Sequence, residues 1–110
     1  MTPNPTPFEV VETARIRLKP GRSEADLIAA SDQFQAAFLS QVDGFLARDL
    51  LRASDGSFLD LVRWSSPEAA RAIMAAAMSS PDCLAYFDLM EMGNDPAEGV
   101  SHLTVLRRYG

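Results

Sequence analysis

The stretch from residue 45 to residue 64 constrains the fold of this chain more than any other part. Two runs rich in leucine and aromatic residues, Phe45–Arg52 and Ser57–Trp64, flank the sequence Ser54-Asp55-Gly56. Glycine supplies the positive φ angle that tight turns need, and short apolar runs bounded by such turns are typical of strands. The segment therefore predicts a β-hairpin, which would form the middle of a small sheet.

Before the hairpin, the sequence predicts one strand and one helix. Residues 9–19 alternate from Val11 onward, with Ala14, Ile16 and Leu18 on one side, and Pro20-Gly21 ends the run. Ser23 is a good helix N-cap, and apolar residues then recur at helical spacing to about Gln41. Gly44 is a natural stop before the hairpin begins.

After the hairpin, the same order of elements returns. Ser66-Pro67 combines an N-cap with proline at the first helical position, which predicts a helix over 67–78. Ser80-Pro81 repeats this signal for a short further helix. A loop is predicted over 91–99, and a last strand over 100–108.

The order β-α-β-β-α-β predicts a ferredoxin-like α+β fold: a four-stranded antiparallel sheet with both helices on one face. A chain of 110 residues corresponds to one domain, which we place at 9–110. Residues 1–8 are rich in proline and threonine and are predicted to be a disordered N-terminal arm.

The hairpin strands are apolar on both faces, although the predicted helices can cover only one. Leu59 and Leu61 lie on one face of the second hairpin strand, and Phe58, Val62 and Trp64 lie on the other. The first hairpin strand, over 45–52, shows the same mixture. An uncovered apolar face usually marks an interface, so we expect a homodimer formed through this sheet face. The alternative is a monomer with scattered exposed leucines.

Composition excludes several classes of partner. The net charge is −5, and no basic cluster is longer than Arg107-Arg108, which argues against nucleic acid and against an anionic membrane surface. Cys83 is the only cysteine, so no intramolecular disulfide can form. No apolar run reaches the length of a membrane span, and the cytoplasm is the expected location.

Several phrases together resemble a known group of proteins. These phrases are ARIRLKPG, DGFL, LDLVRWSSPEAA and MSSPDC, in that order, within a resemblance that covers Val11 to Tyr109. The chain is similar to the dimeric α/β-barrel superfamily, and within it to the antibiotic-biosynthesis-monooxygenase-like proteins. The resemblance implies a dimer with a small-molecule pocket inside each subunit, between sheet and helices.

Members of that superfamily include cofactor-independent oxygenases and haem-degrading oxygenases. The haem degraders carry an asparagine on the first strand, a tryptophan ending the third strand and a histidine on the second helix. Trp64 matches the tryptophan, but Ala14 stands in place of the asparagine, and residues 67–78 contain no histidine. A glutamate common in monooxygenase-like relatives is Val62 here. We therefore expect no cofactor. The resemblance to the monooxygenase-like proteins implies a small aromatic or polyketide-like ligand.

Two residues are candidates for proton transfer. His102 is the only histidine, and its neutral pKa range suits acid–base work, although a hydrogen-bonded structural histidine at a sheet end is the simpler interpretation. Asp60 lies between two leucines, and a buried acid is rare unless it is paired. It could act as a base near Asp49 or His102, or it could pair with an arginine.

Other residues are candidates for a pocket wall. Trp64 could stack on a flat ligand or simply fill the core, and Asp49 is predicted to share the face of Asp60 if the hairpin is regular. Phe87 and the methionines could form an adaptable wall or an ordinary core. No Cys/His cluster suggests a metal site.

Three functional hypotheses remain open at this point. The first is a cofactor-independent monooxygenase-like enzyme that uses Trp64 for stacking and Asp60 or His102 for proton transfer. The second is a non-catalytic small-ligand-binding or sensing dimer. The third is a structural protein with a filled core, which a void beside Trp64 would contradict.

Overall fold

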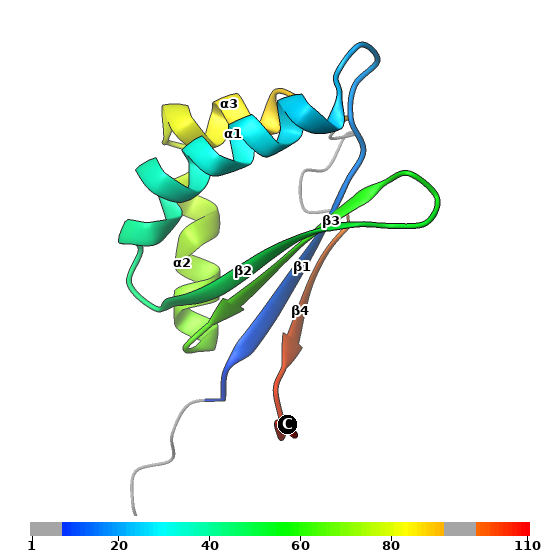
Figure 1. The fold of residues 1–110 in the computed structure, drawn as a ribbon. Helices are drawn as coiled ribbons and strands as arrows, with labels where there is room; N and C mark the ends of the chain where they lie inside the picture. The colour runs from blue at the N-terminus through cyan, green and yellow to red at the C-terminus, as the bar shows by residue number, and fades with distance from the viewer. Residues whose placement is uncertain (1–7, 92–98) are drawn as a thin grey trace, which may run out of the picture.

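The computed structural model describes residues 8–91 and 99–110 of the chain. Its elements are β1 (Val10–Ile16), α1 (Glu24–Ala37), a 3₁₀ turn (Leu39–Gln41), β2 (Phe45–Arg52), β3 (Phe58–Trp64), α2 (Pro67–Ala77), α3 (Pro81–Phe87) and β4 (Val100–Thr104). The strands form one antiparallel sheet in the order β2-β3-β1-β4. Figure 1 shows the three helices on one side of this sheet, so the predicted ferredoxin-like α+β fold is confirmed.

The caps predicted from the sequence form the helix starts. The Ser23 side chain accepts from the Asp26 backbone N–H, and the Asp26 carboxylate accepts from the Ser23 N–H, which completes a capping box. The Ser66 hydroxyl oxygen likewise accepts from the Ala69 N–H at 3.2 Å. No helix in the described ranges has the length and hydropathy of a bilayer-spanning segment.

The last strand is shorter than the predicted 100–108. β4 ends at Thr104 because its only partner strand, β1, begins at Val10, which pairs with Thr104. One further bond, from the Val105 N–H to the Glu9 carbonyl at 2.8 Å, closes the ladder. The predicted arm lies, apart from the exposed Phe8, outside the described residues, as does most of the predicted loop 91–99.

The hairpin register differs from the regular one that would place Asp49 beside Asp60. The Ala53 N–H donates to the Ser57 carbonyl at 2.8 Å, so the turn encloses three residues, and Asp60 pairs with Leu50. Asp49 pairs with Leu61 on the opposite face and is exposed. The prediction for Asp49 is therefore wrong, because moving the register by one residue exchanges the faces of a strand.

A β-bulge between Phe45 and Ala47 then restores Phe45 to the helix side of the sheet. Phe45 packs edge-on against Trp64, with ring centroids 6.0 Å apart. As a result, β2 presents Phe45, Arg48 and Leu50 toward the helices. Arg48 thereby becomes an inward-facing charge that the sequence pattern did not reveal.

The core lies between the sheet and the helices. Its largest fully buried side chains come from every layer, which couples the helices to the strands: Trp64, Tyr86, Ile16, Leu27, Leu39 and Cys83. Burying such side chains stabilises the fold by about 1.5–3 kcal/mol each.

The other face of the sheet has no helix over it in the described part of the chain (Figure 1). Alternation places five large aliphatic residues on it: Val11, Leu51, Leu59, Leu61 and Leu103. Leu51 and Leu103 are 42% and 55% exposed in the single chain. The apolar second face predicted from the sequence is thus present, and we call these five residues the outer patch.

Gly44 is the glycine on which the approach of α2 to the sheet depends. Its φ is +86°, and a Cβ atom there would lie 2.5 Å from the Cβ of Ala69 and 2.9 Å from the hydroxyl of Ser65. Gly56 has a similar φ of +88° but nothing within 4 Å. The two positions therefore share a backbone requirement and differ in packing.

We expect Gly44→Ala to destabilise the protein more than Gly56→Ala. Both substitutions carry the left-handed penalty of about 1–2 kcal/mol, and Gly44→Ala adds an overpacking cost of about 1–3 kcal/mol. Urea unfolding of the two variants measures the difference. Equal losses would show that α2 can move away from Gly44 without cost.

Candidate functional site

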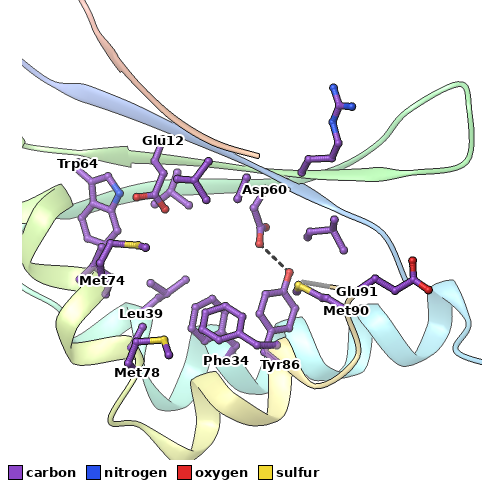
Figure 2. A pocket seen from close by; sticks show the side chains of 18 residues that line it. Glu12, Phe34, Leu39, Asp60, Trp64, Met74, Met78, Tyr86, Met90 and Glu91 are labelled. Atoms are coloured by element: carbon purple, nitrogen blue, oxygen red, sulfur yellow. Dashed lines mark hydrogen bonds between the residues drawn. The ribbon is translucent and has the colours of Figure 1, made fainter. Parts of the chain in front are cut away.

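A cavity of about 130 Å³ lies between the sheet and the helices. Figure 2 shows Glu12, Asp60 and Trp64 reaching into it from the sheet, toward Phe34 and Tyr86 on the helices. An apolar cavity of about 150 Å³ can hold benzene, so this space suits a small aromatic molecule, and flexible methionine side chains in its lining can adapt to one somewhat larger than benzene. A filled core beside Trp64, as the third hypothesis requires, is contradicted.

Trp64 forms one end of the cavity. Its side chain is fully buried, and its indole Nε1 is a buried polar atom without a hydrogen-bond partner in the described residues. A buried indole N–H usually finds an acceptor, and leaving it unpaired costs about 1–3 kcal/mol. A bound molecule could therefore supply the missing acceptor if the side chains that cover the Trp64 N–H moved aside.

The helix side of the cavity is mostly apolar and adaptable. Phe87 lines the cavity, together with Met74, Met78 and Met90. Methionine side chains are flexible and fit differently shaped ligands. Met92, the other methionine considered for this wall, lies outside the described residues.

Asp60 is paired with an arginine, one of the two alternatives left open by the sequence. Arg48 donates from Nε to Asp60 Oδ1 at 3.0 Å, and its terminal nitrogen lies 2.9 Å from the same oxygen. The Tyr86 hydroxyl donates to Asp60 Oδ2 at 2.8 Å, the dashed line in Figure 2. Both carboxylate oxygens of Asp60 are thus engaged.

Arg48 is held on several sides. Its guanidinium carbon lies 5.1 Å from the Phe34 ring centre and 5.3 Å from that of Tyr86, at cation–π distance. It also donates to the Tyr86 hydroxyl at 2.9 Å and to the Ser31 carbonyl at 3.4 Å. The Arg48 and Asp60 side chains are only 6% and 9% exposed, which makes this a buried ion pair.

Burial sets the protonation of this group. It raises the pKa of Asp60, and the Arg48 charge and the Tyr86 hydrogen bond oppose that rise. Burial and the Asp60 charge also raise the pKa of Tyr86, so its hydroxyl stays protonated and remains a donor. Because Arg48 binds the Ser31 carbonyl on α1 and both Arg48 and Asp60 bind Tyr86 on α3, the network holds these two helices to the sheet.

A second acidic group lines the cavity on β1. Glu12 faces the helices between Val10 and Ala14, and its side chain is 13% exposed. His102 lies directly opposite on β4, with Nε2 2.9 Å from Glu12 Oε1. Burial raises the pKa of Glu12, the hydrogen bond from His102 lowers it, and the Asp60 charge adds a smaller rise.

His102 is not among the described residues that line the cavity. Its side chain is 40% exposed and contacts the cavity only through Glu12. The suggested pairing of Asp60 with His102 is wrong, because Asp60 aligns with Ala14 on β1, whereas His102 aligns with Glu12. Each acid has its own partner, Arg48 for Asp60 and His102 for Glu12.

Sequence reasoning missed Glu12, Arg48 and Tyr86. Glu12 could have been found, because it has the same parity in its strand as Ala14 and Ile16, which were assigned to one side. Arg48 depended on the hairpin register. Tyr86 lies on a helix of seven residues, too short for a periodic pattern to show its buried face.

Glu12 provides a prediction about pH and stability. Because its folded pKa is raised, its contribution to stability is complete below its ordinary value of 4.5 and is lost as pH rises through the folded pKa. We therefore expect Glu12→Gln to gain stability relative to the wild type between pH 4 and pH 7. Urea unfolding of both proteins at pH 4 and pH 7 measures this gain in stability. A stability difference between the two proteins that stayed constant with pH would contradict the raised pKa of Glu12.

Comparisons with solved structures find the same fold in oxygenases. SnoaB from Streptomyces nogalater, a cofactor-independent oxygenase, aligns at a TM-score of 0.66 and 22% identity, over 94% of this chain and 96% of SnoaB. A candidate antibiotic biosynthesis monooxygenase from Caulobacter crescentus aligns at 0.67 and 15% identity, over 93% of each chain. This chain has the fold of the antibiotic biosynthesis monooxygenases. No protein-family model and no curated protein matches the sequence.

The antibiotic biosynthesis monooxygenase fold also occurs in a haem-degrading protein from Mycobacterium tuberculosis, with a TM-score of 0.59 and 19% identity over 94% of this chain and 100% of that one. The residues here do not fit haem. The only histidine, His102, is turned to Glu12, and Ala14 lines the cavity where the haem degraders' asparagine is expected. No group of three metal-ligating side chains occurs among residues 8–91 and 99–110.

Proposed function

We propose that this chain is an antibiotic-biosynthesis-monooxygenase-like protein that oxygenates a small aromatic or polyketide-like molecule without a cofactor. The observation that carries the proposal is the cavity beside Trp64, which is mostly apolar, sized for a small aromatic molecule and bordered by an indole N–H that has no partner within the described residues. Its fold is shared with SnoaB, a cofactor-independent oxygenase.

The proposed reaction begins with loss of a proton from the substrate. A base removes a C–H proton beside a carbonyl, and the electron pair enters the conjugated enolate. Dioxygen accepts these electrons and forms a bond to that carbon. Protonation gives a hydroperoxide at that carbon, which then loses its second hydrogen as the O–O bond breaks. The carbon becomes a carbonyl that keeps one oxygen atom, and the other oxygen leaves as water with the two hydrogens lost from the carbon. A mostly apolar pocket favours this chemistry because it limits the access of bulk water to the enolate.

The site residues take different parts in this proposal. Trp64 would donate its N–H to the substrate oxygen, and Phe87 would pack against the ring. Asp60 was a candidate base, but both of its oxygens accept hydrogen bonds, so we assign it to holding Arg48 and Tyr86. His102 would act only through Glu12, whose Oε1 it contacts.

The test uses 1,3-dihydroxynaphthalene, an enolisable compound whose oxygenation consumes one dioxygen and gives 2-hydroxy-1,4-naphthoquinone and water. We expect the protein to raise dioxygen uptake at least about tenfold over the spontaneous rate. Ala77→Leu, which fills the cavity, should remove most of this gain. Ala76→Leu, on the exposed side of α2, is the matched control and should keep it.

A non-catalytic ligand-binding role is the second candidate. It is favoured by the engagement of both Asp60 oxygens with Arg48 and Tyr86, which suits a structural role for that acid better than a catalytic one. Binding of the naphthalenediol with no dioxygen uptake would support this role over the enzyme.

We also propose that the protein works as a homodimer through the outer patch of Val11, Leu51, Leu59, Leu61 and Leu103. The patch draws on all four strands, and no described helix covers it in the single chain. A second copy offers the same surface, so sheet-on-sheet packing would bury both patches together.

A further inference from the structure

Glu12 is an exception to the pattern of its strand. The other inward positions of β1 are Val10, Ala14 and Ile16, all of which suit a core. A carboxylate at a mostly buried position carries a desolvation cost, which persists only where a partner or a function offsets it. The position of Glu12 therefore needs an explanation that packing does not provide.

His102 accounts for one of the two Glu12 oxygens. Its Nε2 lies 2.9 Å from Oε1, in the directly paired position of the neighbouring strand. Within the described residues, Oε2 makes no hydrogen bond to protein. Glu12 differs in this respect from Asp60, which uses both oxygens.

The surroundings of Glu12 match those of a general base. It lines the cavity, as does Trp64, and Figure 2 shows the two side chains reaching into the same part of it from the sheet. The charged or titratable groups that face Glu12 are His102 on β4 and Asp60 on β3. A bound enolisable ketone could place its oxygen at the Trp64 N–H and its acidic C–H toward Oε2.

We propose that Glu12 is the general base of this pocket and that His102 is the positioning residue that holds it. This inference rests on the proposed function. In the step, the substrate C–H bond breaks, an O–H bond forms at Glu12 Oε2, and the electron pair moves into the enolate, whose oxygen the Trp64 N–H stabilises. His102 keeps Oε1 occupied, so that Oε2 stays directed at the substrate.

Anaerobic hydrogen–deuterium exchange tests the base separately from oxygenation. With 1,3-dihydroxynaphthalene in deuterated buffer without dioxygen, we expect the wild-type protein to accelerate exchange of the ring C–H protons. Glu12→Gln should reduce that acceleration at least about 100-fold, and Glu12→Asp should recover part of it. Glu68→Gln, an exposed glutamate on α2, is the control and should exchange like the wild type.

His102→Asn gives the readout that separates positioning from a structural role. The hydrogen bond from His102 lowers the pKa of Glu12, so its removal should move the acidic limb of the exchange–pH profile to higher pH. An unchanged profile would remove His102 from the mechanism. A variant that merely unfolded would instead lose exchange at every pH together with its circular dichroism signal.

The outcomes distinguish this inference from the proposed function. Exchange in the wild type without dioxygen uptake would support Glu12 as the base and overturn the oxygenase. Dioxygen uptake that survives in Glu12→Gln would support the oxygenase and overturn Glu12. If a wild-type protein shown to bind the probe does not accelerate exchange, Glu12 is not a base.

Discussion

Replacing Arg48 with methionine should destabilise the protein by about 3–5 kcal/mol at pH 7, because it leaves the Asp60 carboxylate buried without a charged partner. The side chains of this pair are 6% and 9% exposed, so bulk water solvates the lone carboxylate only weakly. Urea unfolding measures the loss. The loss should shrink toward pH 4, where protonation of Asp60 removes the unpaired charge.

Two variants show whether the buried charge causes the loss. Arg52→Met breaks an ion pair with Glu24 whose side chains are 67% and 40% exposed, and it should cost less than about 1 kcal/mol. The double variant Arg48→Met with Asp60→Leu should recover most of the stability, since neither charge remains. If the double variant were as unstable as the single one, lost packing around the guanidinium would be responsible instead.

The second large effect concerns the outer patch. Leu61→Lys should weaken self-association at least about 100-fold, equivalent to about 2.7 kcal/mol, because a sheet-on-sheet contact would bury the new charge. Asp49 pairs directly with position 61, so the lysine has a partner within the free subunit and the fold should tolerate it. Sedimentation equilibrium of the wild type and the variant gives the two dissociation constants.

Leu84→Lys is the control, because Leu84 is 45% exposed on α3, away from the outer patch. It should associate like the wild type. A wild-type protein that is monomeric at micromolar concentration would contradict the homodimer, and the outer patch would then remain exposed in solution.

Much of the fold could be predicted because its signals are local. The caps at Ser23 and Ser66 and the turn glycine at Gly56 lie within a few residues of the elements that they start or join. The apolar second face of the sheet also follows from alternation within a single strand, as at Leu59 and Leu61. Local chemistry of this kind needs no knowledge of the tertiary structure.

The site was only partly predictable, because its contacts depend on registers between strands. Asp60 was recognised as a buried acid from its leucine neighbours, but its partners Arg48 and Tyr86 are 12 and 26 residues away in the sequence. A three-residue turn instead of a two-residue one decided whether Asp49 or Arg48 faced the helices. A single sequence does not determine such a register.

Glu12 shows a different limit. Its strand was predicted, and its side of the strand could have been read, yet a charged residue near the start of a strand is ordinarily solvated. Only the pairing of β1 with β4 shows that His102 lies directly beside Glu12. Only the lining of the cavity shows that the Glu12 side chain also reaches into it. The chemistry of a site depends on such placements more than on residue type.

The claim on which the proposed function depends is that a small aromatic molecule binds in the cavity beside Trp64. Trp64 is the only tryptophan, so its indole N–H gives a single resolved nuclear magnetic resonance signal at the site. On titration with 1,3-dihydroxynaphthalene, that signal should shift saturably in the wild type and in Ala76→Leu, but not in Ala77→Leu. An indole signal that stayed unmoved up to the solubility limit of the probe, in a folded wild-type protein, would contradict binding at this cavity.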